Sequence, residues 1–96
     1  MKRIEIILST AIEEDFITKC EENEIQAYTK LVDARGIGNS VPKQGDAVWP
    51  QFNTLFIIYC NDEKVDAFKT VIGKLREQYP SEGIACFVLE ASVLEV

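Results

Sequence analysis

Gly36 and Gly38 lie in the part of the chain best suited to binding a small molecule. Glycines allow positive φ and a close backbone approach, so their amide groups can face a phosphate or another anion. The spacing lacks the Walker pattern and the third glycine of a dinucleotide fingerprint, so the ligand stays open. Alternatively, the glycines only end a strand. The predicted ligand-binding residues are Arg35, Gly36, Gly38, Asn39, Ser40 and Lys43.

Three bulky residues, Trp49, Pro50 and Phe52, follow in the same segment. Aromatic side chains supply a large contact area, which is why they are common at protein interfaces. Two interpretations stay open: the segment is a lid or partner-docking element, or it fills a groove on another copy of the chain. In both cases we predict that these residues bind a partner.

Catalysis by familiar nucleophile arrangements is excluded because the chain contains no histidine. A small enzyme with Asp46 or Tyr28 as base is the weakest hypothesis, since no pair of titrating groups is evident. The cysteines Cys20, Cys60 and Cys86 are odd in number and form no CxxC pair, so we expect three buried thiols and no metal site. The acidic residues of the first predicted helix are interpreted as a solvated face. We therefore expect that the protein is not an enzyme.

The first half of the chain predicts a strand, a helix and a strand. Residues 3–9 alternate between two faces, as a strand does. Thr10 stands three residues before Glu13, which is the spacing of a capping box, and apolar residues then follow at helical spacing to about residue 22. Residues 25–34 are rich in β-formers and predict the second strand.

The second half repeats this order. Residues 54–60 and 84–89 are apolar on both faces and predict two covered strands. Between them, Asn61 is expected to cap a helix that ends before Pro80. Residues 92–96 are expected to add a short edge segment.

Together these elements predict a single domain, residues 1–96, of the α+β class with a ferredoxin-like βαββαβ fold. Two helices should cover one face of a four-stranded antiparallel sheet, and the long loop 36–53 should join the second and third strands. This loop exceeds what a hairpin needs, which is typical of functional loops. Because the uncovered face is predicted to be apolar, we expect other copies of the chain to bury it.

The net charge of −6 works against binding to nucleic acid. The start Met1-Lys2-Arg3 is followed by too short an apolar run for a signal peptide, and no run is long enough to span a membrane. We therefore expect a cytoplasmic protein with no nucleic-acid partner and no direct membrane insertion.

Several segments resemble the PII-like signalling superfamily, relatives of the nitrogen-regulatory P-II proteins. They are Met1 to Ile7, Leu31 to Gly38, Asn61 to Ala67 and Gly83 to Leu89. The resemblance implies a homotrimer that binds a small effector, a molecule or an ion, in clefts between subunits. It also implies that the 36–53 segment matches the family's T-loop and regulates a partner, either a membrane transporter or an enzyme.

The chain departs from this family at the segments that hold nucleotide phosphates. The family's Gly-x-Gly-Lys stretch is replaced by Pro80-Ser81-Glu82-Gly83, and the tail 91–96 carries no base. An adenine nucleotide is therefore a weakly supported candidate, and the effector is unknown. The alternative is a metal-responsive protein similar to the CutA relatives, which would require an exposed cysteine near Glu90.

Overall fold

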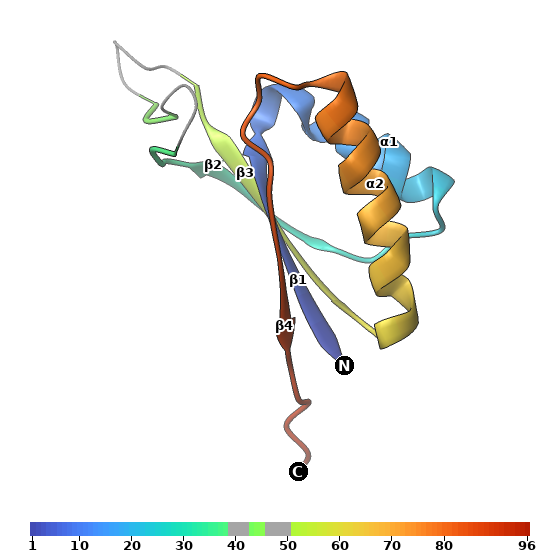
Figure 1. Cartoon of the computed structure of the whole chain (residues 1–96). Coiled ribbons are helices and arrows are strands. Elements are labelled where there is room, and N and C mark those ends of the chain that lie inside the picture. Colours follow the sequence, from blue (N-terminus) through green and yellow to red (C-terminus); the bar gives the residue numbers. More distant parts are fainter. Residues whose placement is uncertain (39–42, 46–50) are drawn as a thin grey trace.

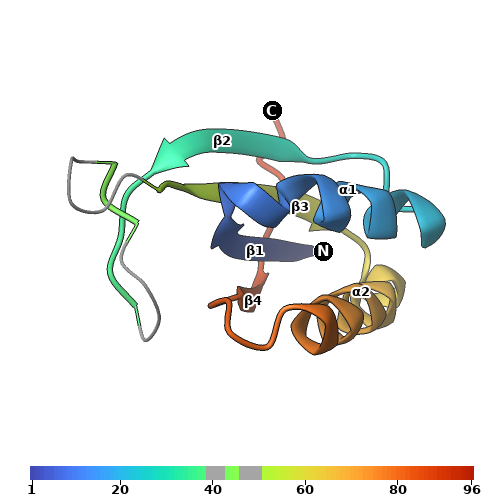
Figure 2. The ribbon, with the colours of Figure 1, turned by 90° about the horizontal axis from the view of Figure 1, so that it is seen from above.

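The computed structural model describes residues 1–38, 43–45 and 51–96. In this part of the chain, four strands form one sheet in the order β2-β3-β1-β4, and every neighbouring pair is antiparallel. The helices α1 and α2 lie on one side of the sheet (Figures 1 and 2). The predicted α+β, ferredoxin-like fold is therefore confirmed. The elements in chain order are β1 (Lys2–Ser9), η1 (Thr10–Ile12), α1 (Glu13–Glu22), β2 (Thr29–Ala34), β3 (Asn53–Cys60), η2 (Asp62–Lys64), α2 (Val65–Gln78) and β4 (Ala85–Glu90).

The first helical segment starts differently from the prediction, because Thr10 does not cap it. Ser9 does so instead: its hydroxyl accepts a 3.3 Å hydrogen bond from the amide of Ala11 at the start of the short 3-10 turn η1. The Thr10 hydroxyl lies 2.9 Å from that of Thr54 on β3. The capping-box prediction was wrong because a tertiary partner engages this hydroxyl.

The second strand begins at Thr29 rather than at Ile25. The amide of Ile25 donates a 2.8 Å hydrogen bond to the carbonyl of Cys20, so it satisfies a carbonyl at the C-terminal end of α1. Ile25 itself is buried in the core. Its apolar character therefore reflects packing against the core and not a place in the sheet.

The second half follows the prediction more closely. The side chain of Asn61 accepts a 3.2 Å hydrogen bond from the amide of Lys64, which confirms the predicted cap. The expected edge segment is wrong, because residues 91–96, all described, are not in a strand. After the amide of Ala91 donates to the carbonyl of Met1 at 3.1 Å, the chain leaves the sheet (Figure 1).

The hydrophobic core lies between the sheet and the helices. It forms because alternate residues of β1 and β3 face the helices, whose apolar stripes cover them. Phe16 of α1 and Phe56 of β3 meet at its centre, with ring centroids 4.6 Å apart. The buried hydrophobic residues are Ile4, Ile6, Leu8, Ile12, Phe16, Cys20, Ile25, Phe56, Ile58, Phe68, Val71, Ile72, Leu75 and Ile84.

The opposite face of the sheet, here called the open face, is covered by neither helix (Figure 2). The strand register brings Ile7, Leu55 and Ala85 into one row across it, and Glu5, Ile57 and Phe87 into the next. Phe87 is 54% exposed and Leu89 is 42% exposed. The predicted uncovered face is thus present and largely apolar.

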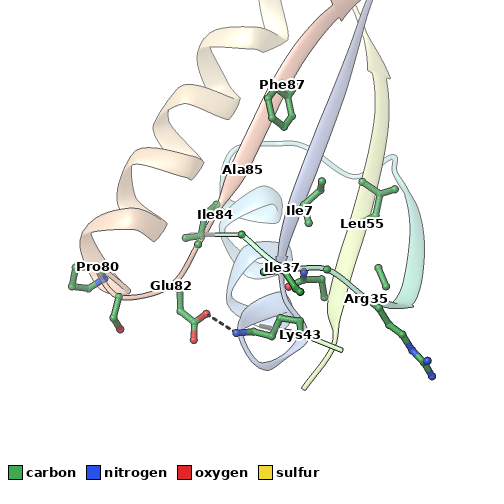
Figure 3. A pocket seen from close by; sticks show the side chains of 16 residues that line it. Ile7, Arg35, Ile37, Lys43, Leu55, Pro80, Glu82, Ile84, Ala85 and Phe87 are labelled. Atoms are coloured by element: carbon green, nitrogen blue, oxygen red, sulfur yellow. Dashed lines mark ion pairs between the residues drawn. The ribbon is translucent and has the colours of Figure 1, made fainter. Parts of the chain in front are cut away.

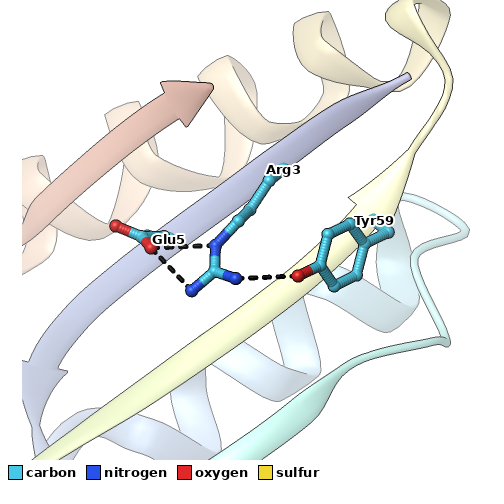
Figure 4. A network of polar contacts seen from close by, with 3 residues as sticks. All are labelled: Arg3, Glu5 and Tyr59. Atoms are coloured by element: carbon cyan, nitrogen blue, oxygen red, sulfur yellow. Dashed lines mark hydrogen bonds and ion pairs between the residues drawn. The ribbon is translucent and has the colours of Figure 1, made fainter. Parts of the chain in front are cut away.

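A network of three polar side chains, Arg3, Glu5 and Tyr59, lies on the open face (Figure 4). The guanidinium of Arg3 donates to the hydroxyl of Tyr59 at 2.7 Å and to the carboxylate of Glu5 at 2.8 Å. The hydrogen bond with Glu5, followed by that with Tyr59, raises the pKa of Arg3. The charges of Arg3 and Glu5 are therefore balanced within the chain.

Candidate functional site

A cavity of about 710 Å³ lies beside one end of the sheet, and it is the candidate binding pocket. Three parts of the chain line it: the segment after β2, the turn between α2 and β4, and the adjoining end of the open face (Figure 3). Residues far apart in the sequence therefore share one site. The lining residues are Ile7, Ala34, Arg35, Gly36, Ile37, Gly38, Lys43, Asn53, Leu55, Pro80, Ser81, Glu82, Gly83, Ile84, Ala85 and Phe87.

Lys43 is fixed at this pocket by the backbone. Its amide donates to the carbonyl of Gly36 at 2.8 Å, and the amide of Gly36 donates to the carbonyl of Lys43 at 2.7 Å. This isolated antiparallel bridge ties Lys43 to the start of the 36–53 loop, and the bridged residues are here called the base of the loop. Gly36, Gly38 and Lys43 thus lie at the same cavity, and their binding of a ligand stays a prediction.

The ammonium group of Lys43 lies 4.0 Å from a carboxylate oxygen of Glu82 (Figure 3). The Lys43 side chain is only 6% exposed, and that of Glu82 is 29% exposed. Removal from water strengthens the interaction between two such charges. An ion pair thus connects the base of the loop to the turn between α2 and β4.

The side chain of Arg35 points in a different direction from that of Lys43, another predicted ligand-binding residue (Figure 3). Arg35 is one of the lining residues, but its guanidinium lies 5.7 Å from the centroid of the Phe52 ring. In Figure 3 the side chain points away from Lys43 and Glu82. A cation above an aromatic face is a stabilising contact. The Arg35 guanidinium therefore contacts Phe52 and lies apart from the Lys43–Glu82 pair (Figure 3).

Phe52 also packs against the loop. Gly45 has φ of +64°, and a Cβ there would lie 2.2 Å from the nearest carbon of the Phe52 ring. The carbonyl of Phe52 accepts a 3.0 Å hydrogen bond from the amide of Thr10. The ring that was predicted to bind a partner is thus in contact with its own chain.

The remaining predicted loop residues, Asn39, Ser40, Trp49 and Pro50, lie outside the described residues. Sequence reasoning missed Glu82 and the apolar wall formed by Ile7, Leu55 and Phe87. The only available signal for Glu82 was its place in the Pro80 to Gly83 stretch. No sequence pattern indicated that this stretch reaches Lys43.

The cysteines differ in burial, which corrects the expectation of three buried thiols. Cys20 is buried, and this burial raises its pKa to about 12. Cys60 and Cys86 are half-buried, and burial raises their pKa values as well. In residues 1–38, 43–45 and 51–96, no group of three His, Cys, Asp or Glu side chains could hold a metal ion. Glu90 pairs with Lys2.

The acidic face of α1 is also less solvated than predicted. Glu13 accepts a 3.0 Å hydrogen bond from the buried hydroxyl of Thr54 and lies 3.6 Å from the ammonium of Lys30. Asp15 accepts a hydrogen bond from the hydroxyl of Tyr79 beyond α2. These two carboxylates hold α1 to the sheet and to the end of α2.

The architecture is that of a small α+β domain with a cavity at one end of an open antiparallel sheet. The chain belongs to the nitrogen regulatory protein P-II family, whose model matches residues 1–96. The resemblance noted in the sequence is thereby confirmed. Among curated proteins, none matches the sequence.

Solved structures of PII-like proteins share the fold. CPII from Thiomonas intermedia K12, bound to ADP, AMP and bicarbonate, matches with a TM-score of 0.70 and 19% identity, over 92% of this chain and 84% of that one. A putative PII-like signaling protein from Thermus thermophilus matches with a TM-score of 0.62 and 21% identity, over 92% and 83% of the two chains. None of the described helices is long and apolar enough to cross a membrane.

Proposed function

We propose that this protein is a PII-like regulator that binds a small effector in the described pocket and passes this signal to a partner protein. The observation that carries the proposal is the Lys43–Glu82 ion pair, which joins the base of the loop to the turn between α2 and β4 across the pocket. A ligand that enters there meets both segments. It can therefore change the position of the loop that a partner contacts.

The effector candidates come from the structural neighbour, which is bound to ADP, AMP and bicarbonate. The pocket supplies an apolar wall for a ring and the cation of Lys43 for an anionic group. The glycine backbone at Gly36 and Gly38 allows a close approach to the ligand. These features support a nucleotide or a small anion as the ligand class.

The functional unit is a homotrimer in this proposal. Neither helix covers the open face, and a second copy would bury its apolar residues. Ile7, Leu55 and Phe87 of this face also line the pocket, so the pocket opens toward the surface that assembly would cover. A neighbouring copy would then supply a further wall, and the effector would bind between subunits.

The signal would leave through the loop 36–53, with Trp49, Pro50 and Phe52 as its partner-binding residues. The partner is a membrane transporter or an enzyme in the cytoplasm, and the protein itself catalyses no reaction. The contacts of Phe52 with Gly45 and Arg35 support this role, because they connect the end of the loop with its middle and with the residue that precedes it.

A thermal-shift titration of the full chain with ADP, AMP and bicarbonate tests the proposal. A ligand that binds only the native state raises the apparent stability. We expect at least one of the three to raise Tm, and the variant Lys43→Met to reduce that rise. The matched control is Lys74→Met on α2, which removes the same charge outside the pocket. If no ligand stabilises the native protein, the proposed effector class is wrong.

A further inference from the structure

We infer that Glu82 determines the ligand specificity of this pocket, by making it select nucleosides and monophosphates over di- and triphosphates. The inference rests on the proposed function, because it assumes that the effector binds in this pocket. It concerns a residue that lies in the turn between α2 and β4, at the cavity wall.

The Glu82 carboxylate lies at the cavity wall and is partly shielded from solvent. It lies 4.0 Å from the ammonium of Lys43, and its side chain is 29% exposed. Water and salt screen a partly buried charge less than an exposed one. Glu82 therefore repels an anionic group that enters the cavity more than a fully exposed carboxylate would.

The charges of the described residues that face the cavity are balanced. Among the described lining residues, only Arg35, Lys43 and Glu82 are charged, and the Arg35 guanidinium lies over the Phe52 ring instead. One cation and one anion remain at the cavity (Figure 3). A phosphate chain attracted by Lys43 would meet the Glu82 carboxylate at the same place, and each added phosphate increases the repulsion.

The rest of the wall suits a ligand with little charge. Ile7, Leu55 and Phe87 present apolar surface from three neighbouring strands, and Phe87 is 54% exposed. A flat heterocyclic ring can pack on such a surface. One polar group on that ring or its sugar could still reach Lys43. A nucleoside or a nucleoside monophosphate meets both requirements.

Calorimetric titration with adenosine, AMP, ADP and ATP at low ionic strength tests this inference. For the native chain we expect affinity to fall from AMP to ATP. Glu82→Gln keeps the size of the side chain and an oxygen that accepts from Lys43, but removes the repulsion. We expect it to tighten ADP and ATP binding by about tenfold and to change adenosine binding by less than about twofold. The increase in ADP and ATP affinity caused by Glu82→Gln should be smaller in concentrated salt.

The matched control is Glu77→Gln, which removes the same charge from the exposed face of α2, outside the pocket. It should leave all four affinities unchanged. If adenosine or AMP binds but Glu82→Gln leaves ADP and ATP affinities as they were, Glu82 does not set the specificity, and the proposed pocket stands. If none of the four compounds binds either folded protein, the nucleotide pocket itself is wrong and the specificity inference falls with it.

Discussion

The guanidinium of Arg3 donates a 2.7 Å hydrogen bond to the hydroxyl of Tyr59 across the two central strands, β1 and β3. Arg3 also pairs with Glu5 at 2.8 Å, so these two charged groups of the open face have partners within the chain. Burying an unpaired charge is costly, whereas a paired and hydrogen-bonded charge is tolerated. This network allows another copy to cover Arg3 and Glu5 without leaving either charge unpaired.

The first prediction concerns assembly through the open face. Leu89 is 42% exposed and lies opposite Arg3 in the strand register, so Leu89→Glu adds a carboxylate to this face beside a cation that Glu5 already pairs. Assembly would then bury an uncompensated charge. By light scattering, we expect the native protein to have the mass of a trimer. We expect the Leu89→Glu variant to be folded and to have the mass of a monomer. Val88→Glu is the control, because Val88 is 49% exposed on the other side of the same strand. A native monomer would contradict the proposed trimer.

The second prediction concerns the buried hydroxyl of Thr54. Its side chain is fully buried, donates to Glu13 at 3.0 Å and lies 2.9 Å from the Thr10 hydroxyl. Thr54→Val keeps the shape but leaves these partners unsatisfied, which we expect to lower the free energy of unfolding by about 1–3 kcal/mol. Urea denaturation measures the change. Thr70→Val on the exposed side of α2 serves as the comparison, and equal losses for both variants would refute the role of Thr54.

The third prediction concerns the backbone at Gly45. A Cβ at this position would approach the Phe52 ring to 2.2 Å, and the φ of +64° disfavours other residues. We expect Gly45→Ala to displace Phe52, at a cost of about 1–3 kcal/mol. The Thr10 amide, which donates to the Phe52 carbonyl, should then exchange its hydrogen faster.

Gly38→Ala is the control for this loop, since a Cβ there would meet no atom within 4 Å among the described residues. It should leave exchange at Thr10 unchanged. Unaltered exchange at Thr10 in Gly45→Ala would show that the ring is not held as the structure indicates.

The fourth prediction concerns alkaline pH. Burial raises the pKa of Cys20 to about 12 from its ordinary value of 9.0, so the folded protein keeps a proton that the unfolded chain loses. This contribution to stability is complete below pH 9 and should be lost progressively as pH rises toward 12, by up to about 1.4 kcal/mol per pH unit. Denaturant unfolding at a series of pH values gives the free energy of unfolding of the native chain and of Cys20→Ala. Lysines and tyrosines titrate in both proteins, so subtracting one free energy from the other leaves the contribution of Cys20. If the free energies of unfolding of the two proteins change with pH in parallel, the raised pKa of Cys20 is contradicted.

The order of the elements and the uncovered apolar face could be predicted from the amino-acid sequence. Period-two alternation in β1 and helical spacing in α2 follow from how side chains leave a strand and a helix, so they can be read without knowing any partner. Asn61 could likewise be assigned as a cap, because a cap bonds to a backbone amide a few residues away. The glycines of the loop base were found for the same local reason.

The contacts that side chains make between distant elements emerged only from the folded chain. Thr10 resembles a cap in the sequence but meets Thr54 of β3, and Ile25 resembles a strand residue but packs into the core. Glu82 lies far from Lys43 along the chain and meets it only because the turn between α2 and β4 folds onto the loop base. Local periodicity carries no information about such pairs, since the contact depends on how distant elements pack together.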